Sequence, residues 1–238
     1  MKVSLISSTP NAAELLLFTK STRLEMSPSL FGEIKNWPES KKSEELEYMA
    51  NTIESSWEFV DYVFMVEGVS RAYTHQQVRN RAASYAQQTM RVLDMAEFEY
   101  IFTKRNLESK IAVEIIDNCL DVIKHSYKAL VHIEQAPEDA RGILPTNIST
   151  NICCKFNLRE FSYLAKSRTG GRTQDEYQLV INGMVDEVLT IHPWAEKFLF
   201  KHERNYFDDI EAFAKREFHD LKKRGELLKI VDKMRKEA

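Results

Sequence analysis

The segment Phe59–Val66 restricts the fold of this chain most, because aromatic and β-branched side chains fill nearly all of it. Such side chains suit the pleated, half-buried surface of a sheet, so residues 59–69 are predicted to form a strand that Gly68 ends. Residues 2–7 alternate in polarity before a turn and predict an edge strand, and residues 152–156 predict another strand. The fold must therefore contain a sheet.

Helical periodicity occupies much of the remaining sequence. Residues 107–133 repeat apolar side chains at helical spacing and predict a long amphipathic helix, with Ile111, Ile115, Cys119, Val122 and Ile123 on its apolar face. Shorter helices are predicted from Asn11, with Glu14 in a capping-box position, over 41–53, from Leu158, over 174–189, and beyond Trp194.

The overall charge is nearly balanced. The 238 residues carry a formal net charge of −3, with 43% hydrophobic and 29% charged residues, which is typical of a soluble globular protein. Proteins that bind long nucleic acids usually have a positive excess or a basic stripe, so we expect no such partner. The sequence shows no leader pattern and no apolar run of membrane-spanning length. We expect a cytoplasmic protein, in the host cytoplasm if a virus encodes it, with no membrane partner.

The three cysteines are predicted to be buried apolar residues. Cys119, Cys153 and Cys154 form no CxxC motif and have no histidine at metal-ligand spacing, so no metal site is expected. A nucleophilic cysteine is the alternative, but no neighbouring residue indicates a lowered pKa.

Residues 76–91 contain three arginines among small polar side chains. No lysine occurs between Lys42 and Lys104, so each positive charge of this region is a planar fork suited to bidentate binding of phosphate or carboxylate. Gln76, Arg79, Asn80, Ala83 and Gln87 are separated by steps that predict one polar, ligand-facing side of a helix. For Arg71, just upstream, the prediction is a structural ion pair with Glu67 or another acid.

The pattern Gln76-x-x-Arg79-x-Arg81-x-x-Ser84-x-x-Gln87-x-Thr89-x-Arg91 resembles the signature of the flavin-dependent thymidylate synthases, the ThyX family. The usual text of that family is Arg-His-Arg, seven residues, Ser. The likeness covers about residues 1–195 and continues through residues 67–72, 137–145 and 157–159, Arg168, Gln174 and Glu176.

The resemblance implies an α+β fold in which helices flank a mixed or antiparallel sheet. It implies a ThyX-like catalytic domain at 1–195, and residues 196–238 would be a C-terminal helical extension packed on or next to it. It also implies a homo-oligomer, a tetramer in the family, whose active sites are shared between subunits.

Ligand-binding roles follow from the resemblance residue by residue. The positions that would bind dUMP are Gln76, Gln77, Val78, Arg79, Gln87, Gln88, Thr89, Met90, Arg91, Arg141 and Arg168. The positions that would bind FAD are Ser55, Arg79, Asn80, Arg81, Gln87, Asn157, Leu158, Arg159 and Tyr163. Arg168 would act as the catalytic residue, reaching the pyrimidine from a neighbouring subunit.

The implied reaction is the reductive methylation of dUMP to dTMP, with 5,10-methylenetetrahydrofolate as carbon donor and NADPH as reductant. Arginine chemistry agrees with this reaction. A fixed guanidinium such as that of Arg168 can stabilise the negative charge that develops in the uracil ring. Arg91 and Arg141 can each form charge-assisted bonds to a phosphate, with the Thr89 hydroxyl adding another.

Departures from the family pattern leave two alternatives open. Asn80, Ile53 and Phe59 replace histidines, Thr89 replaces a serine, and Val92 replaces a frequent tyrosine. Asparagine forms hydrogen bonds but carries no proton near pH 7. One alternative is a sister enzyme that methylates or hydroxymethylates dUMP or another pyrimidine nucleotide, such as dCMP or UMP. The other is a non-catalytic partner that binds flavin or nucleotide.

Overall fold

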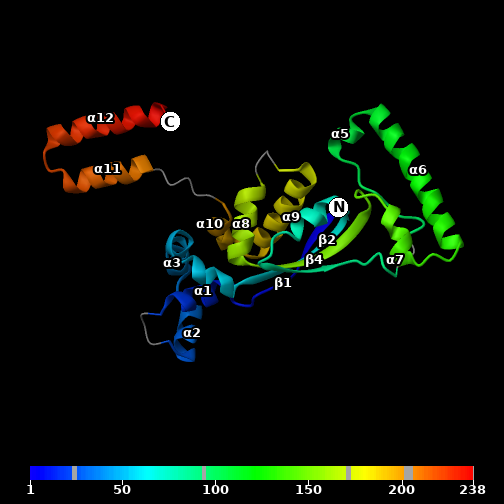
Figure 1. The fold of residues 1–238 in the computed structure, drawn as a ribbon. Helices are drawn as coiled ribbons and strands as arrows, with labels where there is room; N and C mark the ends of the chain where they lie inside the picture. Colours follow the sequence, from blue (N-terminus) through cyan, green and yellow to red (C-terminus); the bar gives the residue numbers. More distant parts are fainter. Residues whose placement is uncertain (23–25, 93–94, 170–172, 201–205, 238) are drawn as a thin grey trace. The chain divides into compact units, whose positions relative to one another are not determined.

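The computed structural model describes the chain except residues 23–25, 93–94, 170–172, 201–205 and 238. It divides into two compact units, Met1–Phe200 and Lys201–Ala238 (Figure 1). Residues 196–200 thus lie in the first unit, whereas we had placed them with the C-terminal extension. The second unit consists of a pair of helices.

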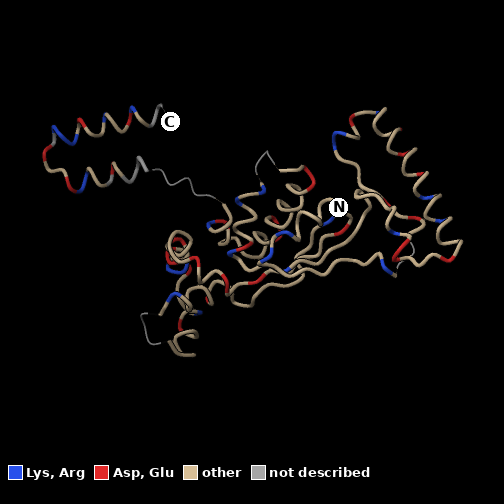
Figure 2. Tube along the Cα trace, in the orientation of Figure 1, with Lys and Arg blue, Asp and Glu red and all other residues tan. Residues whose placement is uncertain are grey.

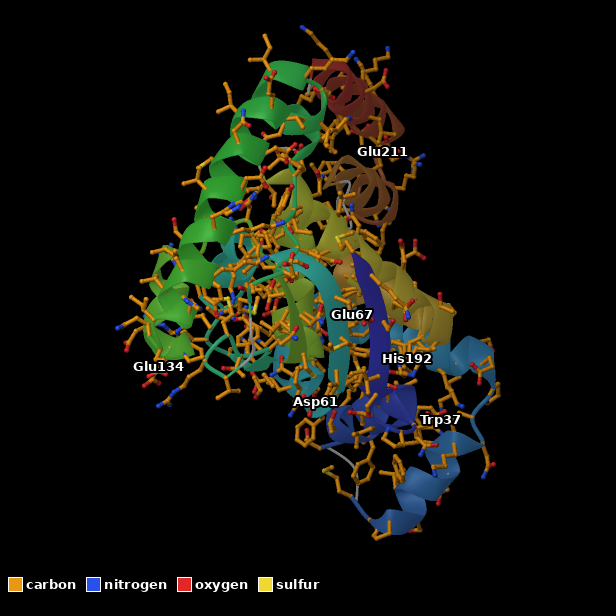
Figure 3. All side chains as sticks on the ribbon, turned by 90° about the vertical axis from the view of Figure 1, so that its right-hand side faces the viewer. Trp37, Asp61, Glu67, Glu134, His192 and Glu211 are labelled. Atoms are coloured by element: carbon orange, nitrogen blue, oxygen red, sulfur yellow. The ribbon has the colours of Figure 1, made fainter. Side chains whose placement is uncertain are left out.

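A four-stranded antiparallel sheet forms the centre of the first unit. Its order is β1-β2-β4-β3, and the bounds are β1 (Lys2–Ser8), β2 (Asp61–Ser70), β3 (Ala83–Gln87) and β4 (Ser149–Asn157). In Figure 3, Asp61 and Glu67 mark the lower and upper parts of β2. The α+β class and the three predicted strands are confirmed, whereas β3 was not predicted.

Helices make up most of the rest of the described chain. Their bounds are α1 (Ala12–Lys20), α2 (Pro28–Lys35), α3 (Glu39–Thr52), α4 (Arg71–Gln77), α5 (Lys104–Leu107), α6 (Lys110–His132), α7 (Pro137–Ala140), α8 (Leu158–Arg168), α9 (Asp175–Ile191), α10 (Glu196–Leu199), α11 (Tyr206–Glu217) and α12 (Leu221–Glu237). Three 3₁₀ turns join them: η1 (Glu54–Phe59), η2 (Arg141–Ile143) and η3 (Pro193–Ala195). No helix in the described ranges is long and apolar enough to cross a membrane.

Two helix starts differ from expectation. The capping box at α1 is wrong, because Asn11 makes no side-chain cap and Glu14 instead accepts a hydrogen bond from Lys42 at 2.8 Å. Helix α2 was missed, although Ser27 caps it and Pro28 opens it, a combination that favours a helix start.

One face of the sheet forms the main hydrophobic core. Phe64 and Phe156 are fully buried on neighbouring strands and pack against Phe161 of α8, with ring centroids 5.3 and 6.3 Å from that ring. Helices α8 and α9 cover this face (Figure 1). The opposite face carries exposed Ser84 and Ala86 of β3, so it is not sealed as the first face is.

A β-bulge at Gly68 aims the end of β2 toward α4. The pairing of β2 with β4 shifts register between Val66 and Val69, and Gly68 takes a positive φ of 64°, which favours glycine. We had predicted that the strand ends at Gly68, but it continues through Gly68 to Ser70. The Ser70 hydroxyl then caps α4 by accepting from the amide of Tyr73 at 3.0 Å.

Helix α6 confirms the long amphipathic helix predicted over 107–133, but its apolar side chains point in two directions. Leu120 and Tyr127 are buried, whereas Ile111, Ile115 and Val122 are 71%, 64% and 65% exposed. Glu134 lies just past the end of this helix (Figure 3). Both signs of charge are spread along α6 (Figure 2), so the apolar stripe is bordered by charged residues.

Alkaline pH is expected to destabilise the first unit through four tyrosines, Tyr62, Tyr73, Tyr85 and Tyr177. Burial raises the pKa of each phenol, chiefly because the phenolate is poorly solvated there. The unfolded chain ionises near pH 10, so the free energy of unfolding is unaffected by these groups below about pH 10 and falls above it. Each group contributes a slope of up to about 1.4 kcal/mol per pH unit. Urea unfolding between about pH 8 and pH 11 measures the fall.

Lysine side chains also titrate in this pH range, so two phenylalanine variants are used to identify the contribution of the buried phenols to the alkaline slope. Tyr62→Phe removes one buried phenol and should reduce the alkaline slope. Tyr48→Phe, at a residue 53% exposed, should leave the slope unchanged. Identical slopes in the two variants would contradict the assignment.

Candidate functional site

Residues 76–91, the arginine segment, contain the end of a helix, a turn and a strand. The prediction of a single helix that carries Gln76 to Gln87 on one side is therefore wrong. Helix α4 ends at Gln77, and β3 begins at Ala83. Within β3, Ala83, Tyr85 and Gln87 alternate with exposed Ser84 and Ala86, which is the periodicity of a strand. Pairing with β4 outweighs the coincidental helical spacing of the polar residues.

Two predicted nucleotide residues converge on one acid. Arg91 Nε donates to Glu138 Oε2 at 2.5 Å, and Arg141 Nε donates to the Glu138 backbone carbonyl at 3.1 Å. Thr89 lies beside them, since its hydroxyl accepts from the Arg91 amide at 3.0 Å. The Arg91 side chain is 67% exposed and can therefore exchange its carboxylate partner for a ligand.

Arg71 joins this cluster, although we had predicted an ion pair with Glu67. Its Nη2 donates to the Gln88 carbonyl at 2.9 Å, and its Nε is buried without a hydrogen-bond partner in the part of the chain that the structure describes. Burial, and then the charge of Arg141, lower the pKa of Arg71, so the two guanidinium groups lie near each other. No ion pair of Arg71 occurs among the described residues. The sequence signal for a ligand-binding role of Arg71 was its position within residues 67–72, which match the family. We had instead predicted a structural ion pair for this residue.

The remaining predicted nucleotide residues are spread over two regions. Gln76 is exposed and donates to Gln174, and Arg79 is exposed just after α4. Gln87 donates to the Thr74 hydroxyl at 2.9 Å, and the Gln88 amide donates to the Asn151 carbonyl at 2.9 Å. Of the other three, Val78 is 41% exposed and Gln77 is fully buried. Met90 packs against a small hydrophobic cluster of Phe98, Leu120 and Ile148.

Three predicted flavin residues line one pocket of about 540 Å³: Asn157, Arg159 and Tyr163. Asn157 caps α8 by accepting from the amide of Glu160 at 2.9 Å, which fixes the helix start at the pocket wall. Arg159 Nη1 donates to Glu58 at 2.6 Å, and Tyr163 is 64% exposed. The pocket thus presents an aromatic ring and a cation to the solvent.

The other predicted flavin residues surround this pocket unevenly. Ser55 is exposed on η1, between the pocket residues Glu54 and Trp57, and Leu158 is buried beneath the pocket. Arg81 is exposed next to Ala82, which lines the pocket. Asn80 is half-buried and does not line this pocket, and its Nδ2 donor has no hydrogen-bond partner among the described residues.

Arg168 is the exposed last residue of α8. Its guanidinium carbon lies 5.4 Å from the ring centroid of Tyr177, over the ring. The guanidinium of Arg168, the predicted catalytic residue, therefore packs over an aromatic ring of its own chain.

The three cysteines differ in burial: Cys154 is buried, Cys153 is half-buried and Cys119 is exposed. Burial, and then Cys153, raise the pKa of the Cys154 thiol to about 12, so it stays protonated at neutral pH. Cys119 is exposed on α6, so the prediction that all three are buried is wrong for this residue. Within the described ranges, no group of three His, Cys, Asp or Glu side chains could hold a metal ion.

A sequence profile of the Thy1 family, described as "Thymidylate synthase complementing protein", matches residues 4–194. The chain belongs to the Thy1 family. This confirms the resemblance to the flavin-dependent thymidylate synthases. The match ends before the second compact unit begins.

Relatives named flavin-dependent thymidylate synthase support the Thy1 assignment. The Clostridium tetani protein is 31% identical over 216 residues, which cover 83% of this chain and 86% of that protein. The Sulfurisphaera tokodaii protein is 35% identical over 133 residues, covering 56% and 51%. The Nitratidesulfovibrio vulgaris protein is 32% identical over 173 residues, covering 64% and 71%. Residues 4–194, which match the Thy1 family, make up most of the first compact unit, Met1–Phe200.

Proposed function

We propose that this chain is an FAD-dependent thymidylate synthase that methylates dUMP to dTMP, with 5,10-methylenetetrahydrofolate as carbon donor and NADPH as reductant. The observation that carries the proposal is the arginine cluster of Arg71, Arg91 and Arg141 on a member of the Thy1 family.

The cluster is suited to a phosphate dianion. The Arg91 guanidinium pairs with the Glu138 carboxylate, whereas those of Arg71 and Arg141 donate to backbone carbonyls, so two of the three positive charges have no carboxylate partner among the described residues. Among the described residues neither Arg71 nor Arg141 forms an ion pair, so both guanidinium groups can donate charge-assisted hydrogen bonds to a phosphate. Arginine forks give such bonds a fixed direction, and direction is what orients the rest of a nucleotide.

Arg168 is suited to the pyrimidine ring. C5 of uracil is a poor nucleophile until negative charge is pushed into the ring, and a guanidinium beside N3 and the carbonyl oxygens stabilises that charge where it develops. The residue is exposed at the end of a helix, so it can reach a nucleotide held by another subunit.

The pocket beside α8 fits a flavin. A volume of about 540 Å³ lies within the usual range of cofactor sites, about 300–1,000 Å³. The exposed ring of Tyr163 supplies a stacking surface, and Arg159 supplies a guanidinium. When bound, FAD would supply the hydride and relay the one-carbon unit. Asn157, Arg159 and Tyr163 would hold and orient it.

Asn80→His restores the usual family residue and is expected to tighten FAD binding about 3- to 10-fold, the equivalent of one added hydrogen bond of about 1 kcal/mol. The buried, unpartnered amide is the physical reason, because it shows a polar contact left unmade in the free protein. Flavin titration by fluorescence quenching measures the change. Asn36→His, at the distant end of α2, is the control, and equal affinities in all three proteins would contradict this prediction.

The shared site requires an oligomer, and we propose a homotetramer. The exposed stripe of Ile111, Ile115 and Val122 on α6 supports this, because contiguous exposed apolar surface usually marks an interface. Sedimentation at micromolar concentration tests it, and a monomer would contradict it.

Product mass tests the reaction. The purified protein is reconstituted with FAD and incubated with dUMP, dCMP or UMP in turn, with methylenetetrahydrofolate and NADPH. We expect dUMP to gain a methyl group. A gain matching hydroxymethyl, or turnover of dCMP or UMP instead, would identify the sister enzyme. A protein that binds FAD and dUMP without turnover would be a non-catalytic partner.

A further inference from the structure

We propose that Tyr177 is a positioning residue that holds the guanidinium of Arg168 in its working orientation; this role rests on the function proposed for Arg168. The guanidinium carbon lies over the Tyr177 ring, 5.4 Å from its centroid. Among the described residues, no carboxylate forms an ion pair with Arg168, so Tyr177 orients the guanidinium, through its ring face and through a hydrogen bond to its phenol.

The ring can serve as a platform because it is itself immobile. Tyr177 is 1% exposed, and its ring meets that of Tyr73 edge to face at 5.3 Å and 75°. An arginine at a helix end samples many rotamers, whereas a fixed aromatic face restricts them. The attraction at an exposed site is only about 0.5–1 kcal/mol, weak enough for the guanidinium to contact a substrate as well.

The same platform is connected to the nucleotide segment. The Tyr73 hydroxyl donates to Gln77 Oε1 at 3.2 Å, and Gln77 immediately follows Gln76 in α4. Gln76 in turn donates to Gln174, just before the start of α9, which carries Tyr177. The orientation of Arg168 is thus linked to the helix end at which Arg79 begins the signature.

The phenol remains neutral under working conditions. Burial raises the pKa of Tyr177, and the charge of Arg168 and its hydrogen bond to the phenol only partly oppose this rise. A phenolate would bind the guanidinium as an ion pair and compete with the substrate. The neutral ring orients Arg168 without that competition.

Three variants test the role in the FAD-loaded enzyme. Tyr177→Leu removes the ring and should lower kcat about 3- to 5-fold, corresponding to about 0.5–1 kcal/mol, with an unchanged Kd for dUMP. Tyr177→Phe keeps the ring, loses only the hydrogen bond between the phenol and Arg168, and should restore kcat to within about twofold of wild type. Tyr62→Leu, at another fully buried tyrosine of the same core, controls for lost packing and should leave kcat unchanged below its melting temperature.

A shape-preserving series covers the case in which Tyr177→Leu does not fold. Phenylalanine and trifluorophenylalanine at position 177 differ mainly in the negative charge of the ring face, so kcat should fall on fluorination. An active wild type with equal kcat in Tyr177→Leu, or in the two ring analogues, overturns the positioning role alone. A wild type that binds neither FAD nor dUMP overturns the proposed function instead.

Discussion

Arg168→Ala is expected to lower kcat by about 100- to 1,000-fold, the usual loss when one preorganised donor to developing charge is removed. Folding and assembly should be unaffected, because the side chain is exposed and its described contact is one aromatic ring. Steady-state kinetics with dUMP, together with sedimentation, measure both results. The matched control is Arg216→Ala, another exposed arginine over a ring, that of Phe213, in the second unit.

Mixing subunits sharpens this result. If Arg168 acts on a nucleotide held by a neighbour, Arg168→Ala subunits and subunits lacking a phosphate arginine are each inactive, but their mixed tetramers contain intact sites. Activity should reappear on mixing after mild dissociation. Near-normal activity of Arg168→Ala alone would show that the catalytic role is misplaced, and failure of mixing would contradict shared sites.

Arg71→Leu is expected to raise the Kd for dUMP about 10- to 100-fold, since a hydrogen bond to a charged group contributes about 1.5–3 kcal/mol. Stability without ligand should change little, because the variant removes a half-buried charge whose Nε has no partner. Calorimetric titration and urea unfolding measure the two effects.

Deoxyuridine, which lacks the phosphate, provides the discriminating comparison. Its affinity should be the same for wild type and Arg71→Leu, whereas dUMP affinity falls only in the variant. Arg105→Leu, an exposed arginine on α5, should change neither affinity. A parallel loss of deoxyuridine binding would indicate that Arg71 supports the protein rather than the phosphate.

The fold was predictable where local pattern and tertiary structure agree. Residues 59–69 and 107–133 satisfy one periodicity over a long stretch, and each forms the expected element. Strand β3 was not predictable, because four of residues 83–87 are small or polar and their spacing is also compatible with a helix. Their strand conformation depends on hydrogen bonds from β4, more than sixty residues away in sequence.

The site was predictable from motif rather than from pattern. Position in the signature indicated Arg91, and position in the 137–145 match indicated Arg141; the structure brings both to Glu138. Arg71 could not be assigned from sequence, because its significance depends on Arg141, seventy residues later, and on a donor left without a partner. Tyr177 was equally hidden, since its value lies in an exposed arginine above it.

The apolar stripe of α6 has a consequence for newly made chains. If this stripe is the interface of the proposed oligomer, a subunit carries Ile111, Ile115 and Val122 in water until it assembles, so chaperones and proteases compete with assembly for each nascent molecule. The steady-state amount of enzyme should therefore rise more steeply than the rate of synthesis.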